Sequence, residues 1–294
     1  MRMKQLRYFI EVYQQMSFSR ASGELGISQP ALSKVIAQLE DELHVQLFDR
    51  SSRQLRVTHE GETMYTYAQK VMREAEDMKR AAEDIRLHRK GRFTFGLPPV
   101  IGSSFFPHII STFKDAYPDA DLRIVEEGAK DMERSLLEGS IDVGVGILPI
   151  NEAAFDVVPL VERKLLLVVS ESHPLAEREH VPLTALRDEN FLLFMRGFSL
   201  YDRVREACID AGFEPKIVNE STQWDFLLKL ARENMGITFL PETVLADAAT
   251  SGIKTIDVHH PSIHWNLALI RRKNSYQSPA AEEWIRWVRA YFGD

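Results

Sequence analysis

Residues 17–43, SFSRASGELGISQPALSKVIAQLEDEL, hold the pattern that decides the fold of the N-terminal part. Two short amphipathic segments meet at Gly26, the first ending near Leu25 and the second beginning at Ser28. Serine is a favoured N-cap, and a proline in the first helical turn, here Pro30, loses no backbone hydrogen bond. Two helices joined by a turn of three or four residues are typical of the helix-turn-helix that reads DNA. An ordinary helical hairpin with a polar outer face is the alternative.

The first turn of the second helix carries polar side chains that suit base edges and phosphates in a major groove, namely Gln29, Ser33 and Lys34. A polar turn and a short alternating strand follow residue 43, which predicts a β-wing with Arg50 and Arg53 near its tip. Arginine in a narrow minor groove reads DNA shape. A solvated turn is the alternative for these arginines.

A long helix is predicted to begin after Thr58 and to run to about residue 88. Apolar residues recur along it at alternating steps of four and three, which makes a heptad seam. The seam consists of Met64, Ala68, Val71, Ala75, Met78, Ala82 and Ile85. A helix of about 30 residues is roughly 45 Å long, so the seam would face water without a partner. We predict that the same helix of a second subunit covers it; packing on the helix's own domain is the alternative.

Composition indicates a soluble protein of two or three domains. The chain of 294 residues is 45% hydrophobic, and its single cysteine excludes an internal disulfide and suits a reducing compartment. No apolar signal segment and no membrane-length apolar run are visible, so we predict a cytoplasmic protein without a membrane partner. The first 90 residues carry 15 Lys and Arg against 13 Asp and Glu, whereas the rest carries 21 against 30. Nucleic-acid binding by the N-terminal part therefore requires basic residues gathered on one face.

Residues 3–61 resemble the N-terminal domain of the LysR-type transcriptional regulators. The helix-turn-helix, the LFDR turn at residues 47–50, the wing and the T-x-x-G helix start at residues 58–61 follow one another at the spacing of that family. The resemblance implies dimers or tetramers that bind partly palindromic promoter sites, respond to a small metabolite and meet RNA polymerase. Lys34 departs from the arginine of many relatives. The complete predicted DNA-binding set is Ser28, Gln29, Pro30, Ser33, Lys34, Arg50 and Arg53.

From residue 92 onward, strand and helix patterns alternate, which favours parallel-rich α/β sheets. The resemblance implies a C-terminal domain similar to periplasmic binding proteins, with two α/β lobes. The predicted fold class is thus an α+β winged helix-turn-helix, a long linker helix and an α/β effector domain. The predicted domains are residues 1–58 for the winged module, 59–91 for the linker helix and hinge, and 92–294 for the effector domain, with lobe one at 92–162 plus 265–294 and lobe two at 163–264.

A small molecule is expected between two such lobes, near the carboxyl ends of strands and the N-termini of helices. Four loops qualify, among them residues 98–104, which lead into a helix predicted to begin at Gly102. Arg196 is the one fixed charge in these loops, so an anion, in particular a carboxylate, is the expected ligand. Plain helix capping is the alternative for each serine and threonine. The predicted effector-binding residues are Pro99, Ser103, Ser104, Arg196, Phe198, Ser199, Thr222 and Pro241.

The remaining patterns indicate no other chemistry. Cys208 lies between apolar neighbours in a predicted helix, so it is interpreted as a core thiol rather than a redox sensor. The histidines lack zinc-ligand spacing, and no phosphate loop or nucleophile elbow stands out, so we predict no metal, no cofactor and no enzymatic activity. A pure solute-binding protein and an enzyme using the C-terminal cleft are the rival hypotheses. The loops SSFFPHII (103–110) and ESTQWDF (220–226) look similar to a branch of the family that responds to acetate or pyruvate.

Overall fold

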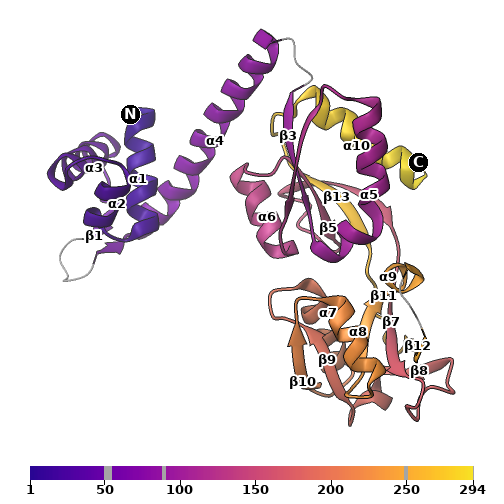
Figure 1. Ribbon diagram of the computed structural model, residues 1–294. Coiled ribbons are helices and arrows are strands. Elements are labelled where there is room, and N and C mark those ends of the chain that lie inside the picture. The colour runs from indigo at the N-terminus through magenta and orange to yellow at the C-terminus, as the bar shows by residue number, and fades with distance from the viewer. Residues whose placement is uncertain (50–54, 88–90, 248–250, 294) are drawn as a thin grey trace. The chain divides into compact units, whose positions relative to one another are not determined.

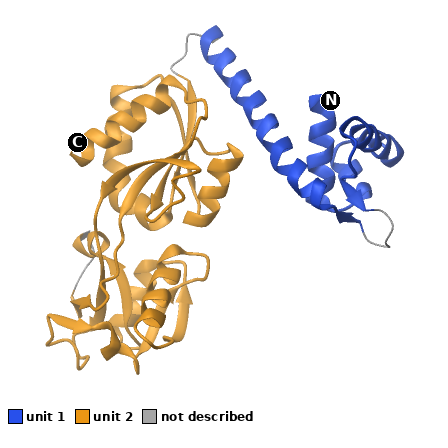
Figure 2. Cartoon of the chain, turned by 180° about the vertical axis from the view of Figure 1, so that it is seen from behind, with its two compact units in different colours: residues 1–87 blue, residues 88–294 orange. Residues whose placement is uncertain are grey.

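The chain divides into two units, residues 1–87 and residues 88–294 (Figure 2). The structure is a computed structural model that describes residues 1–49, 55–87, 91–247 and 251–293. Within these ranges, no helix has both the length and the apolar character needed to span a bilayer.

The first unit begins with three helices around the predicted turn (Figure 1). They are α1 (Met3–Gln15), α2 (Phe18–Glu24) and α3 (Gln29–Leu43). The Ser17 and Ser28 hydroxyls cap α2 and α3 by accepting from the backbone N–H groups of Arg20 and Ala31 at 3.3 and 3.4 Å. Gly26 adopts φ +64° between the two helices, a conformation that glycine reaches without steric cost. The helix-turn-helix predicted from residues 17–43 is confirmed.

A wing and a long helix complete the first unit. The wing pairs β1 (Phe48–Asp49) with β2 (Arg56–Val57) in antiparallel register, and α4 (His59–Leu87) follows. Arg50 and Arg53, predicted near the wing tip, lie outside the described residues. The core gathers side chains from α1, α3 and β1 and the first half of α4, including Phe9, Leu32, Ile36, Phe48 and Ala68.

The junction between the wing and α4 leaves no room for a side chain at Gly61. Thr58 Oγ1 donates to Gln46 O at 2.6 Å and accepts from the Gly61 N–H at 2.9 Å, so Thr58 both caps α4 and anchors it to the segment before β1. A Cβ atom at Gly61 would lie 2.2 Å from Leu47 O and 2.7 Å from Val57 Cγ2. The glycine therefore allows the helix to start in contact with β2 and with the residue that precedes β1.

The second unit contains a first lobe built on a five-stranded sheet in the order β4-β3-β5-β13-β6. Its strands are β3 (Arg92–Leu97), β4 (Asp121–Glu126), β5 (Val143–Ile147), β6 (Phe155–Val161) and β13 (Leu267–Arg272). Helices α5 (Pro99–Ala116) and α10 (Pro279–Phe292) contact each other, and α10 also packs on β3. Helix α6 (Ala129–Glu138) packs on β3, β5 and β13 with its own small core around Met132 and Leu136.

The second lobe contains a four-stranded sheet in the order β11-β7-β12-β8 and a parallel β9–β10 pair. A bridge between Phe191 and Ile237 connects the two. The elements are β7 (Leu165–Ser170), β8 (His180–Pro182), η1 (Leu183–Leu186), β9 (Asn190–Phe194), α7 (Ser199–Asp210), β10 (Lys216–Ser221), α8 (Trp224–Arg232), β11 (Thr238–Pro241), α9 (Glu242–Asp247) and β12 (Ile253–His259).

Both lobes have mixed sheets, which corrects the prediction of mainly parallel ones. Strand β13 runs antiparallel between β5 and β6, and β7 runs antiparallel to both β11 and β12. In the first lobe the cause is the path of the chain, because the chain runs through the whole second lobe before β13 returns to the first sheet. The periodicity of apolar residues in a strand indicates which face is buried. It does not indicate whether a strand distant in the sequence pairs in parallel or antiparallel orientation.

Two short segments carry the chain between the lobes and are hydrogen-bonded to each other. The Trp265 N–H donates to Arg163 O at 2.7 Å, and the Leu165 N–H donates to Ile263 O at 2.9 Å. The Asn266 side chain adds a third bond by accepting from the Arg163 N–H at 3.2 Å. The lobes are therefore joined by a paired crossover that comprises residues 162–165 and 263–266.

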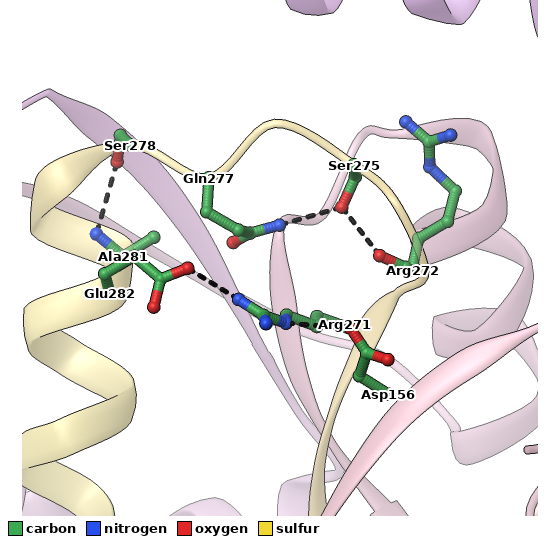
Figure 3. A network of polar contacts seen from close by, with 8 residues as sticks. All are labelled: Asp156, Arg271, Arg272, Ser275, Gln277, Ser278, Ala281 and Glu282. Atoms are coloured by element: carbon green, nitrogen blue, oxygen red, sulfur yellow. Dashed lines mark hydrogen bonds and ion pairs between the residues drawn. The ribbon is translucent and has the colours of Figure 1, made fainter.

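A polar network fastens the last helix to the first lobe (Figure 3). The Arg271 guanidinium pairs with Asp156 at 3.2 Å and with Glu282 at 2.6 Å, so it links β6, β13 and α10. The Ser278 hydroxyl caps α10 by accepting from the Ala281 N–H at 3.2 Å. These contacts hold the C-terminal helix against the sheet.

We expect Gly61→Ala to lower the free energy of unfolding of the first unit by about 1–3 kcal/mol, because the added methyl group overlaps Leu47 O and Val57. Gly23→Ala is the matched control: nothing lies within 4 Å of its Cβ position, and alanine favours the helix by up to about 1 kcal/mol. Thermal unfolding of residues 1–294 carrying each change measures both. Equal stability of the two variants would refute the close approach at Gly61.

Candidate functional sites

The first turn of α3 presents its polar side chains outward. Leu32, Ile36 and Leu39 are fully buried on the opposite side, which fixes the rotation of the helix. Of the predicted DNA-binding residues in this turn, Ser28, Gln29, Pro30 and Lys34 are exposed and Ser33 is half-buried.

The Gln29 side chain is held in place by the preceding helix. The Ser19 hydroxyl on α2 donates to Gln29 Oε1 at 3.0 Å. Helices α2 and α3 thus position a flexible amide at the exposed end of α3 before any ligand arrives. Amide groups form paired hydrogen bonds with adenine in a major groove. The turn therefore has the residues and the exposure that base contact requires.

The predicted heptad seam of α4 divides into two parts. Ala68 is buried and Met64 half-buried in the core of the first unit. Farther along, Val71, Met78 and Ile85 are 41%, 69% and 74% exposed. Ala75 is half-buried and Ala82 is exposed. The first part of the seam thus packs on its own unit, as the alternative interpretation held, and the rest faces solvent.

A pocket lies between the two lobes of the second unit and encloses about 320 Å³, part of it open to solvent. It is bounded by the ends of strands, the beginnings of helices and one residue of the crossover. The lining residues are Pro98, Pro99, Val100, Ile101, Gly128, Ala129, Ile147, Phe198, Ser199, Leu200 and Trp265.

Three helices begin at this pocket, namely α5, α6 and α7. Their N-cap residues are Pro98, Gly128 and Phe198, none of which has a side-chain oxygen, and no described side chain caps these helix ends. The first N–H groups of a helix lack intrahelical partners, and a helix N-terminus carries about half a positive charge. The pocket is therefore bordered by uncapped backbone donors from both lobes.

The lobes touch each other beside the pocket. Lys130 Nζ on α6 lies 2.7 Å from Asp202 Oδ2 on α7, and this hydrogen bond raises the pKa of Lys130. The Arg203 guanidinium on α7 donates to Leu148 O in lobe one and to His264 O in the crossover. Burial lowers the pKa of Arg203, the nearby Glu206 opposing this shift. These contacts connect α7 to α6, to lobe one and to the crossover beside the pocket.

The structure brings three of the predicted effector-binding residues into the lining, namely Pro99, Phe198 and Ser199. Ser103, Ser104, Arg196, Thr222 and Pro241 lie outside it. Helix α5 begins at Pro99, not at Gly102 as predicted, so Ser103 and Ser104 fall in its second turn. Their hydroxyls donate to Val100 O at 3.3 and 2.9 Å, within their own helix and outside the pocket lining.

Arg196 is likewise engaged elsewhere. Its side chain is 79% exposed, its Nε atom lies 3.8 Å from Glu220 Oε1, and its guanidinium is 5.9 Å from the centre of the Tyr201 ring. Thr222 is exposed, and Pro241 is buried at the end of β11.

Sequence reasoning missed several residues of the lining, among them Gly128, Ala129 and Trp265. Gly128 and Ala129 follow β4 at the carboxyl end of a parallel strand, so the same rule that selected residues 98–104 applies to them. No sequence signal marks Trp265, because its place in the pocket follows from the crossover.

Cys208 is fully buried in α7. Burial, assisted by Glu214, raises the pKa of its thiol to about 12. The thiolate is the reactive form of cysteine, so this side chain is protected both by burial and by its protonation state.

Comparisons with known proteins cover the whole chain. Residues 3–62 match the family model described as "Bacterial regulatory helix-turn-helix protein, lysR family", and residues 87–293 match the one described as "LysR substrate binding domain". The HTH-type transcriptional regulator YwbI of Bacillus subtilis (strain 168) is 39% identical over 294 residues, which cover 100% of this chain and 98% of that protein.

Solved structures are similar over the same length. A hydrogen-peroxide-bound cysteine mutant of Corynebacterium glutamicum OxyR has a TM-score of 0.62 at 27% identity, covering 99% of this chain and 92% of that one. Full-length CbnR in complex with its target DNA has a TM-score of 0.63 at 22% identity, covering 99% of both chains, and this is a likeness of fold.

We expect Cys208 to resist alkylation in the folded protein. At pH 8, a thiol with a pKa of about 12 is ionised in about one molecule in ten thousand, against roughly one in four for an unfolded cysteine of pKa near 8.5. Iodoacetamide labelling, followed by mass spectrometry, should therefore be at least about 100-fold slower in buffer than in urea. Comparable rates in the two conditions would show that the thiol is accessible and ionised.

Proposed function

The chain belongs to the LysR family of transcriptional regulators, and we propose that its first unit reads promoter DNA while a small anion in the pocket of its second unit switches its activity. Because its relatives are transcriptional regulators, the chain is a regulator and not an enzyme, as predicted. A regulator bound at a promoter meets RNA polymerase there, and we include that contact in the proposal.

The exposed first turn of α3 supports the assignment of the DNA-reading residues. Gln29 and Lys34 supply an amide for base edges and a cation for phosphates, and Ser33 lies beside them. The hydrogen bond from Ser19 restricts the Gln29 amide before binding, so less rotamer freedom is lost when DNA is bound.

The outer half of the α4 seam supports a subunit interface. Val71, Met78 and Ile85 expose apolar surface at heptad spacing, and no packing within the first unit covers them. A second copy of α4 supplies a matching seam, and a two-fold pair of winged modules fits a palindromic site. We therefore propose a homodimer through α4 as the smallest unit that binds DNA, with a tetramer as a further assembly.

The convergence of three uncapped helix N-termini on one pocket carries the proposal for the effector. Their backbone donors and partial positive charges favour a bound anion, and a carboxylate matches them with two acceptor oxygens. Arg196, the earlier candidate for this role, would have to leave Glu220 to reach the ligand. We therefore assign charge compensation to the helix ends. Binding changes activity by favouring one arrangement of the lobes over another.

Gln29→Ala should relax base specificity, because a lost bidentate base contact costs about 1–3 kcal/mol. Gln38→Ala, an exposed glutamine two turns farther along α3, is the matched control and should bind like the original chain. Competition binding between an operator found by genome-wide mapping and its scrambled sequence provides the measurement. If the Gln29 variant distinguished the operator from its scrambled sequence as well as the original chain does, the assignment of α3 to base contact would be wrong.

Met78→Glu should dissociate the dimer, because a charge in the centre of a subunit seam loses its hydration without gaining a partner. The unit itself should stay folded, since Met78 is 69% exposed within one chain. Met235→Glu, which changes a methionine 53% exposed outside α4, is the control. Sedimentation at matched concentrations separates the two variants. If the Met78 variant kept its oligomeric state, the seam would not be the interface.

Ser199→Ala should weaken binding of small carboxylates by about 1.5–3 kcal/mol, the worth of a hydrogen bond to a charged group. Ser103→Ala should leave that binding unchanged, because its hydroxyl is engaged with Val100 O outside the pocket lining. Calorimetry with acetate, benzoate and succinate measures both variants, and effector-free DNA affinity should be unaltered in each. A loss confined to the Ser103 variant would move the site away from this pocket.

A further inference from the structure

We propose that the ligand of the pocket carries a single negative charge on an apolar body, as in an aromatic or branched aliphatic monocarboxylic acid. This inference rests on the proposed function, because it specifies the chemical class of the anion. It excludes dicarboxylates, phosphate esters and polyhydroxy acids.

The side chains of the lining select an apolar body. Of the eleven lining residues, Ser199 and Trp265 alone have a polar side-chain atom, and both of these groups can donate. Apolar walls come from Pro98, Pro99, Val100, Ile101, Ile147, Phe198 and Leu200. Hydroxyl groups of a sugar or polyhydroxy acid placed against these walls would lose their water without finding partners, which is unfavourable.

The extent of the apolar wall favours such a body over a smaller acid. Apolar lining residues come from both lobes, so a ring or a branched chain would contact more of them than a methyl group would. Acetate would leave most of the apolar wall uncovered.

The charges near the helix ends limit the ligand to one negative charge. Three helix N-termini contribute roughly half a positive charge each. Two carboxylates occupy first turns, Asp131 on α6 and Asp202 on α7, and each is paired with a cation, Asp131 with Arg134 and Asp202 with Lys130. All of the described lining residues are uncharged, and Lys130 is paired with Asp202. A second negative charge on the ligand would therefore be desolvated without compensation.

Trp265 supplies an independent reason to expect an acceptor. It is fully buried, it lines the pocket, and its indole N–H has no acceptor within the described part of the chain. A buried donor without a partner is costly, and a carboxylate oxygen of the ligand would be an acceptor for it. Because Trp265 also belongs to the paired crossover, a ligand that engages it acts on the segment joining the lobes.

The test is calorimetry of the full chain with five probes of related shape. Benzoate and cyclohexanecarboxylate combine one charge with an apolar body, benzamide removes the charge, terephthalate adds a second charge, and acetate removes the body. We expect the first two to bind at least about tenfold more tightly than the other three.

Each other result has a distinct meaning. If acetate bound as tightly as benzoate, the inference of an apolar body would be wrong, whereas the proposal of an anion in this pocket would stand. Terephthalate binding as tightly as benzoate would overturn the single charge. Benzamide binding as tightly as benzoate would instead refute the anion itself, and with it the proposed function. Absence of binding by benzoate and cyclohexanecarboxylate would overturn this inference.

A substitution of one lining residue tests whether the preference for an apolar carboxylate arises in this pocket. Val100→Thr replaces a methyl group of the lining with a hydroxyl at nearly the same volume, and it should weaken benzoate binding at least about threefold. Val218→Thr, on the exposed side of β10, is the matched control and should not alter binding. Thermal unfolding checks that both variants are folded. Unchanged benzoate affinity of a folded Val100 variant would place the ligand elsewhere.

Discussion

The hydrogen-bonded crossover is the constraint on which the second unit depends. Two extended segments, residues 162–165 and 263–266, pair with each other, so the lobes are joined at one place by backbone bonds. This pairing sends β13 back into the first sheet in antiparallel sense and brings the starts of α5, α6 and α7 to one pocket. It also puts Trp265 in the pocket wall. A change in the angle of the crossover therefore changes the pocket and the lobe contacts together.

The three helices that begin at the pocket have no side-chain caps from the described residues. Serine, aspartate and asparagine are the residues that normally begin helices, and Ser17, Ser28 and Ser278 do so elsewhere in this chain. At the pocket, the corresponding positions are proline, glycine and phenylalanine. The backbone donors of these helices are thus left to whatever enters between the lobes. A capping side chain at any of these three positions would stabilise its own helix, but it would also occupy the backbone donors that border the pocket.

Structural features that depend on residues close together in the sequence could be predicted, whereas features that depend on distant residues could not. The helix-turn-helix depends on residues within about two turns of one another, so Ser28, Pro30 and Gly26 were sufficient to locate it. The start of α5 was predicted three residues late, because Pro98 and Pro99 resemble a loop as much as a helix start. Because α5 begins at Pro99, Ser103 and Ser104 lie in its second turn and outside the pocket lining. In the sequence, the second lobe separates Trp265 from the lining residues of the first lobe. The apolar residues of the crossover also have the pattern of an ordinary core strand.

The protected state of Cys208 makes this chain convenient for site-specific labelling. The only native thiol is fully buried with a pKa of about 12, so a maleimide dye should react first with any cysteine introduced at the surface. Exposed positions in the two lobes, such as Ile124 on β4 and Val218 on β10, are suitable attachment points. Single-molecule energy transfer between such dyes would follow the separation of the lobes directly, without deleting a native residue.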